Sequence, residues 1–397
     1  MHRTTRRHIS GCERRARLAY RQRLEPAQRA EHVDQVARSV LALHATDPAT
    51  VYLSAAARLA EPRHETVERE LYEREALLRM TAMRCTLFVT PTGLAPVLLA
   101  AAGKPHAANR RKHLLRQLEA SGAGDDRWLE KAGRAVLEVL AERGGASTAE
   151  LAAAVAGLER QIVVAPGKRY ESRRSVAADL MFVLAAEGRV VRGTRRGGWT
   201  SSQHAWALGL ALPELAAASA RAELARLWLG AFGPGTVADL KWWTGWTVTD
   251  TRKALAAAGA VEVGLDEGTG YALTEDLEDL EGMGARVAEP APAAALLPAL
   301  DPTPMGWRER GFYLDPAHVP ALFDRMGNIG PTVWWEGRIV GGWAQRKDGT
   351  LNWRLLEDPG REARTAVEAE AARMAAFLGE RRFTPAYRTP LERELAS

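Results

Sequence analysis

The clearest periodic pattern of apolar and polar positions lies in the middle of the chain and predicts three helices followed by a hairpin. The first helix is expected over residues 128–140. Ser147, with Glu150 three residues later, forms a capping box that begins the second helix. A third helix is expected over about 173–186, and residues 189–199 contain two short extended pieces around a glycine-bearing turn. Three helices and a hairpin, in this order, are typical of a winged helix.

The same order of elements recurs on both sides of this segment. Within residues 220–274, Thr236 is expected to cap a short second helix, and a third helix is expected over 247–258 before two short strands. The first 90 residues fit three helices followed by an extended piece at 86–90, although the pattern is less regular. The sequence therefore predicts a tandem array of helix-turn-helix units.

The C-terminal part of the chain changes from helical to extended patterning. Residues 333–343 alternate around Glu336 and Gly337, which is a signal for a two-residue hairpin. A helix near residues 364–381 is expected to close this β-rich module.

Chain length and these patterns together predict a mixed α+β fold that is mainly α and contains four units. A chain of 397 residues is too long for one ordinary core. We expect a first winged-helix unit over residues 1–125, a second over 126–212, a third over 213–285, and the β-rich module over 286–397.

Composition predicts a soluble globular protein without a metal or cofactor. The chain is 46% hydrophobic and 26% charged, has no run of 18 apolar residues, and begins without the apolar core of a signal peptide. We therefore expect a cytoplasmic, nucleoid-associated protein that does not contact a membrane. The two cysteines form no CxxC motif, and HExxH, P-loop and GxSxG motifs are missing, which leaves little support for metal catalysis or for a hydrolase of another class.

The net charge of +5 is unevenly distributed along the chain. Basic residues gather at 3–23, 104–116 and 160–196, whereas residues 266–289 contain eight acidic side chains and one arginine. Such segregation suits a polyanion bound along one face, because neutralised phosphates release counterions. Solvated helix faces and loops are the alternative. The candidate phosphate ligands, drawn from the predicted hairpin, the start of the third helix and the cluster at 104–116, are Arg192, Arg195, Arg196, Arg173, Arg174, Arg110, Arg111 and Lys112.

Three blocks of the sequence resemble a known family. They are FGPGTVADLKWWTGW at 232–246, LLPALDPTPMGWRER at 296–310 and GPTVWWEGRIVGGW at 330–343, and they are similar to signature blocks of the AlkZ-like bacterial DNA glycosylases. The resemblance implies three tandem winged helices in a C-shaped arrangement, with a small β-barrel-like module. It also implies activity on bulky alkylated purines and on interstrand crosslinks in double-stranded DNA.

The resemblance also points to candidate catalytic residues between two predicted helices. In catalytic members of the family this segment reads Gln, an apolar residue, then Gln or Asp, and the aligned positions here hold His44, Ala45 and Thr46. Histidine occurs at the first position in other members, whereas Thr46 departs from the pattern. Asp47, directly before a proline, is expected to cap the following helix.

Hydrolysis of an N-glycosidic bond passes through an oxocarbenium-like transition state and requires an aimed water molecule. A neutral imidazole with an ordinary pKa of about 6.5 is suited to orienting this water and accepting its proton near pH 7, and a threonine hydroxyl is suited to holding the water. His44 and Thr46 are therefore the predicted catalytic residues of a monomeric, monofunctional glycosylase. The alternative is a non-catalytic DNA-binding protein, such as a transcription regulator or a lesion-shielding protein, in which His44 only ends a helix.

Overall fold

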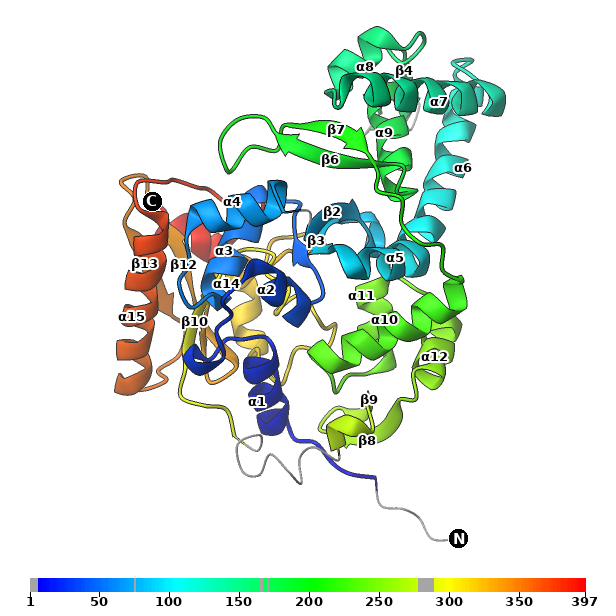
Figure 1. Ribbon diagram of the computed structural model, residues 1–397. Helices are drawn as coiled ribbons and strands as arrows, with labels where there is room; N and C mark the ends of the chain where they lie inside the picture. Colours follow the sequence, from blue (N-terminus) through cyan, green and yellow to red (C-terminus); the bar gives the residue numbers. More distant parts are fainter. Residues whose placement is uncertain (1–5, 75, 165–166, 170, 278–288) are drawn as a thin grey trace, which may run out of the picture.

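The protein combines a compact lower body with a smaller upper segment, as the ribbon of the computed structural model shows (Figure 1). The structure describes residues 6–74, 76–164, 167–169, 171–277 and 289–397, so part of the predicted acidic stretch lies outside it. Helix accounts for 47% of the residues and strand for 18%, which confirms a mixed fold that is mainly helical. No helix among the described residues has both the length and the apolar character needed to cross a bilayer.

The N-terminal part of the chain contains four helices and a small antiparallel sheet with the strand order β1-β3-β2. The helices are α1 (Gly11–Arg21), α2 (Val33–Ser39), α3 (Pro48–Arg58) and α4 (His64–Tyr72), and the strands are β1 (Leu43–His44), β2 (Leu77–Thr81) and β3 (Leu87–Pro91). The extended piece expected at 86–90 corresponds to β3. Two short elements, α5 (Ala95–Leu98) and a π-helical turn (Leu99–Gly103), and the longer helix α6 (Lys104–Ala120) lead to the upper segment.

The non-catalytic alternative expected His44 to end a helix, and in this point it is wrong. Helix α2 ends at Ser39, and Leu41 adopts a left-handed φ of 62° that turns the chain away from the helix axis. His44 then lies in β1, opposite Phe88 of β3. The sequence could not indicate this strand, because two residues are too few to show an alternation of apolar and polar positions.

The upper segment has the predicted order of three helices and a hairpin. Its helices are α7 (Asp126–Arg143), α8 (Thr148–Ala154) and α9 (Val176–Ala186), and its hairpin consists of β6 (Val190–Arg195) and β7 (His204–Leu208). The capping box is confirmed, since Ser147 N donates to Glu150 Oε2 at 2.6 Å and Glu150 N donates to Ser147 Oγ at 3.2 Å. Helix α9 begins later than expected, because β5 (Ser172–Ser175) pairs with β4 (Gln161–Val164) in an additional hairpin.

The same order recurs in the next part of the chain. Helices α10 (Ala217–Phe232), α11 (Val237–Thr244) and α12 (Val248–Ala257) precede the hairpin of β8 (Val261–Leu265) and β9 (Gly268–Ala272). Thr236 caps α11 as predicted, since its Oγ1 accepts a hydrogen bond of 3.1 Å from Asp239 N.

The C-terminal part forms a four-stranded antiparallel sheet with the order β10-β11-β12-β13. The strands are β10 (Ala294–Leu297), β11 (Thr332–Trp335), β12 (Arg338–Gln345) and β13 (Leu351–Leu355), and the helices are α14 (Val319–Leu322), α15 (Arg361–Leu378) and α16 (Pro390–Leu395). The predicted two-residue turn joins β11 to β12, with left-handed φ values of 48° at Glu336 and 71° at Gly337.

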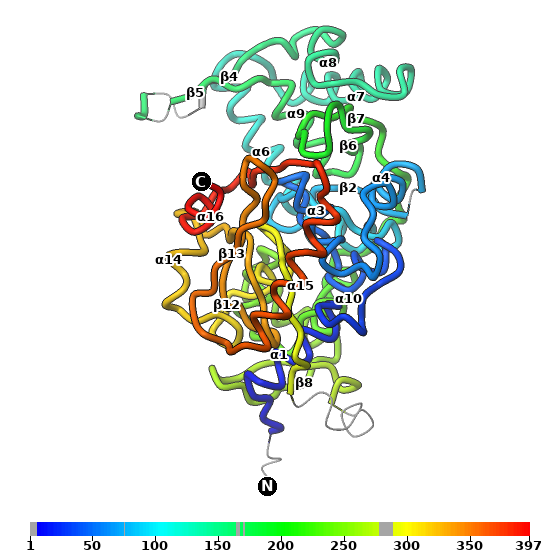
Figure 2. Tube along the Cα trace, turned by 90° about the vertical axis from the view of Figure 1, so that its left-hand side faces the viewer, coloured from blue at the N-terminus to red at the C-terminus, as the bar shows by residue number. Residues whose placement is uncertain are grey.

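Two large apolar cores hold the described parts of the chain together. One core joins the N-terminal helices, α10–α12 and the C-terminal sheet, while a second core of buried residues between 114 and 206 fills the upper segment. Figure 2, turned by 90°, shows the hairpin β6–β7 between this upper segment and the body below it. The hairpin therefore lies where the two bodies meet. The bounds of the four predicted units stay predictions.

Candidate functional site

His44 and Thr46 line the same cavity, which has a volume of about 340 Å³. The cavity lies where three parts of the chain meet. The N-terminal part, α9 with β6, and the C-terminal part supply the remaining lining residues, which are Thr81, Arg84, Cys85, Thr86, Leu87, Phe182, Arg192, Leu300, Met305, Asn328 and Tyr387. Both predicted catalytic residues are thus brought together in a concave site.

The imidazole of His44 is held in a buried position. The residue is 8% exposed, and its ring lies edge-on to Phe88 with the ring centroids 5.4 Å apart. Its Nδ1 is buried and has no hydrogen-bond partner among the described residues. Burial chiefly, and the charge of Arg84 secondly, lower the pKa of His44 to about 4, against an opposing effect of Asp301. The imidazole is therefore neutral at pH 7, with a far lower pKa than the ordinary value that sequence analysis assumed.

Thr46 and Asp47 differ in exposure although they are neighbours. Thr46 is exposed in a bend at the cavity. Asp47 is buried and caps α3, since its Oδ1 accepts from Ala49 N at 3.1 Å and its Oδ2 accepts from Ala386 N at 2.8 Å. The expected capping role of Asp47 is confirmed, and both of its carboxylate oxygens are engaged away from the cavity chemistry.

A strained turn between β2 and β3 places a guanidinium group at the cavity. Arg84 and Cys85 both adopt left-handed φ angles, 51° and 58°, which non-glycine residues rarely do. The guanidinium carbon of Arg84 lies 4.4 Å from the ring centroid of Trp242. No glycine or asparagine marks this turn, so the sequence did not point to Arg84. Such strain is commonly found at functional sites.

The three arginines of the β6–β7 hairpin have different surroundings. Arg192 lines the cavity, with its guanidinium carbon 5.7 Å from the ring centroid of Trp206. Arg195 forms an ion pair with Glu68, donates to the carbonyl oxygen of Trp199 at 2.6 Å, and has a side chain only 7% exposed. Arg196 is exposed and pairs with Glu150 at 3.0 Å. Of the three, only Arg192 reaches the cavity.

The other predicted phosphate ligands lie on the upper segment and on α6. Arg173 and Lys112 are exposed and have no ion-pair partner among the described residues. Arg174 pairs with Asp179 at 2.6 Å, and Arg111 pairs with both Asp126 and Glu130 at 2.8 Å.

Arg110 has a direct connection to the cavity. Its guanidinium carbon lies 4.5 Å from the ring centroid of Phe182, and Phe182 is one of the residues that line the cavity. DNA contacts by Arg110 and by the other seven basic residues stay predictions.

A family model described as "DNA glycosylase AlkZ-like" matches residues 37–377. The chain belongs to the AlkZ-like DNA glycosylase family. The match includes every cavity residue except Tyr387.

A protein sequence and a solved structure from Streptomyces sahachiroi are similar to nearly the whole chain. The chain is 27% identical to an interstrand DNA cross-link repair glycosylase from this organism over 385 residues, which cover 90% of this chain and 94% of that one. It also matches the solved structure of Streptomyces sahachiroi DNA glycosylase AlkZ with a TM-score of 0.73 and 25% identity. That match covers 94% of this chain and 97% of the other.

Proposed function

We propose that the protein is a monofunctional DNA glycosylase that hydrolyses the N-glycosidic bond of bulky alkylated purines in double-stranded DNA, crosslinked purines included. The observation that carries the proposal is the cavity. It joins His44 and Thr46, the two residues aligned with the family's catalytic segment, to the guanidinium groups of Arg84 and Arg192. The name of the 27% identical relative, an interstrand DNA cross-link repair glycosylase, supports the substrate class.

The buried imidazole suits the orientation of a water molecule. A purine alkylated at a ring nitrogen is cationic and leaves as a neutral base, so the C1′–N9 electron pair departs with the base without a strong general acid. Water then attacks C1′ of the sugar. His44, neutral at pH 7, accepts a hydrogen bond from this water and takes up its proton as the C1′–O bond forms. Because burial makes this imidazolium more acidic than an ordinary one, it returns the proton to solvent.

Thr46 and the arginines complete the arrangement that we propose. The exposed hydroxyl of Thr46 holds the water from a second direction. Arg84 and Arg192 have no carboxylate partner within the described residues, so their charges are available to the phosphates beside the extruded nucleotide. These contacts fix the position of the sugar relative to His44.

The repeated order of elements supports DNA binding by tandem winged helices. Three helices and a hairpin occur as α7–α9 with β6–β7 and again as α10–α12 with β8–β9. We interpret these as the second and third winged-helix units of a C-shaped array, with the N-terminal part as the first. The protein is expected to act as a monomer.

A second candidate is a non-catalytic DNA-binding protein, either a transcription regulator or a lesion-shielding protein. Thr46 favours it, because a threonine hydroxyl does not have the reach of the glutamine amide found in catalytic members. In this case the cavity would still hold an extruded base, but His44 would only pack against Phe88.

A base-release assay separates the two candidates. Excess protein is incubated, without added metal ions, with a duplex carrying a single N7-alkylguanine, and abasic sites are counted after alkaline cleavage. We expect release above the spontaneous rate, and a loss of about 10²- to 10⁴-fold in His44→Ala. The matched control is His113→Ala, which removes an exposed imidazole on α6 and should keep the wild-type rate.

Each result decides between the candidates. Release no faster than in protein-free DNA, combined with tight binding to the same duplex, would contradict catalysis and support the second candidate. Release that survives in His44→Ala, with folding confirmed by circular dichroism, would contradict the role given to His44.

A further inference from the structure

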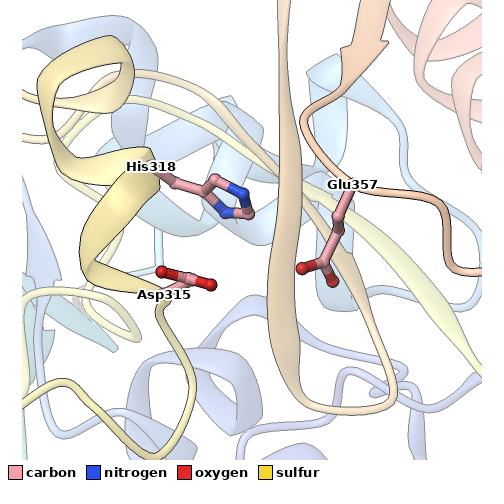
Figure 3. A group of neighbouring side chains, drawn as sticks. All are labelled: Asp315, His318 and Glu357. Atoms are coloured by element: carbon pink, nitrogen blue, oxygen red, sulfur yellow. The ribbon is translucent and has the colours of Figure 1, made fainter.

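Three potential metal ligands converge beside the C-terminal sheet, at a site whose residues are not among those lining the His44 cavity. Asp315 and His318 come from the 3₁₀ turn Pro316–His318 and its cap, and Glu357 follows β13. One ligand atom from each side chain lies within 4.8 Å of the other two. Figure 3 shows the imidazole and the two carboxylates directed toward a common space between the turn and the loop.

Local structure explains how the first two ligands are presented together. Residues three apart on a 3₁₀ helix project from the same face, so Asp315 and His318 lie side by side. Asp315 Oδ1 accepts a hydrogen bond of 2.8 Å from Ala317 N, which fixes the carboxylate and leaves Oδ2 for a ligand. The chain therefore positions this pair without any contribution from a metal.

His318 provides the independent sign that a ligand belongs here. The residue is only 8% exposed, and its Nδ1 is buried without a hydrogen-bond partner among the described residues. Among the described residues, its imidazole forms no ion pair or hydrogen bond with Asp315 or Glu357. A buried polar atom of this kind is rare and calls for a partner.

We propose that Asp315, His318 and Glu357 bind a zinc ion, with water as a fourth ligand. Three atoms within 4.8 Å of one another share a point no more than about 2.8 Å from each, and Zn–N and Zn–O bonds are about 2.0–2.2 Å long. Displacements of the ligand atoms by under about 1 Å therefore bring all three into coordination. An imidazole with two carboxylates suits zinc, whereas Mg²⁺ and Ca²⁺ take oxygen ligands.

Arg338 limits the affinity of this site for zinc, because it already pairs with Glu357. Arg338 forms an ion pair with Glu357 through Oε1, and Arg15 donates to the carbonyl oxygen of Phe312 at 2.9 Å. Both line the cavity of about 280 Å³ that also contains Asp315 and Glu357. Zinc must therefore share Glu357 with Arg338, and removal of this competing guanidinium should strengthen zinc binding.

Zinc at this position would connect the start of α14 to the end of β13. Because these ligands come together only in the folded chain, zinc binding should raise the unfolding temperature. The site would act as a structural clamp on the C-terminal module and takes no part in the chemistry proposed for His44.

Zinc binding can be measured directly on the full chain after removal of any polyhistidine tag. The protein is treated with EDTA, dialysed against micromolar zinc chloride, and analysed for bound zinc by mass spectrometry and for its unfolding temperature by fluorescence. We expect one zinc per chain and a higher unfolding temperature. Asp315→Asn, which keeps the helix cap, and His318→Gln should each weaken binding at least tenfold. Arg338→Gln should strengthen it, and His113→Gln is the matched control that should not change it.

If His318→Gln does not fold, Asp315→Asn still tests the proposal, because Asp315 is exposed. Uptake of less than half an equivalent at tens of micromolar zinc would overturn the proposal. So would equal zinc binding by the wild type and Asp315→Asn, because the metal would then be held elsewhere. These measurements contain no glycosylase step, so their outcome is independent of the proposed function.

Discussion

The lowered pKa of His44 predicts a pH profile that distinguishes this site from one with an ordinary histidine. If the neutral imidazole orients the water, the rate of base release follows the neutral fraction of His44. With the pKa at about 4, this fraction is still about 0.9 at pH 5. With an ordinary pKa of about 6.5 it would be about 0.03. We therefore expect base release to change by less than about 20% between pH 8 and pH 5, where an ordinary histidine would give about a 30-fold loss.

The assay measures single-turnover release of N7-alkylguanine at pH 5, 6, 7 and 8, with enough protein to saturate the duplex at each pH. Doubling the protein concentration checks saturation, and the spontaneous rate at each pH is subtracted. Burial also lowers the pKa of His204 to about 4, so circular dichroism at each pH must show that the fold is intact. A profile with a midpoint near pH 6.5 would refute the account of His44, since its imidazole would then titrate as if exposed to water.

Two further predictions concern stability and DNA affinity. Asp301→Ala leaves the fully buried Arg58 without its bidentate partner and should destabilise the protein by about 3–5 kcal/mol in urea unfolding. Glu61→Ala, which breaks an exposed ion pair, should change stability by less than about 0.5 kcal/mol, and similar midpoints for both variants would contradict this reasoning. Affinity for undamaged duplex should fall about 40-fold between 50 and 200 mM salt if three phosphates are contacted. Arg173→Gln should flatten this dependence, and Arg364→Gln, which changes a paired arginine on α15 outside the basic clusters, should not, whereas no dependence on salt would contradict DNA binding by the basic clusters.

Local signals in the sequence were sufficient for much of the fold. The capping residues Ser147 and Thr236 begin the helices expected of them, and Glu336 with Gly337 forms the expected turn. Each of these features depends on atoms within a few residues along the chain. Hydrogen bonds to nearby backbone groups and the left-handed freedom of glycine can therefore be inferred without knowledge of the tertiary structure.

The candidate site was harder to predict because its walls come from distant parts of the chain. The family resemblance pointed to His44 and Thr46, and the structure places both at one cavity. Phe182 and Tyr387 carry no local signal, and their place at the cavity depends on the packing of α9 against β2 and on the position of the C-terminal part. The lowered pKa of His44 likewise arises from burial, which the sequence does not display.

The β6–β7 hairpin combines a local signal in the sequence with contacts between distant parts of the chain. Trp199, in the loop of the hairpin, packs edge-on against Tyr52 and His64 at centroid distances of 5.7 and 5.6 Å, and Arg195 pairs with Glu68 of α4. The loop is thus fixed to α3 and α4, which leaves Arg192 of the same hairpin at the cavity. Three neighbouring arginines that are equivalent in a sequence pattern therefore have different surroundings, because tertiary contacts bury Arg195 and leave Arg192 at the cavity that His44 also lines.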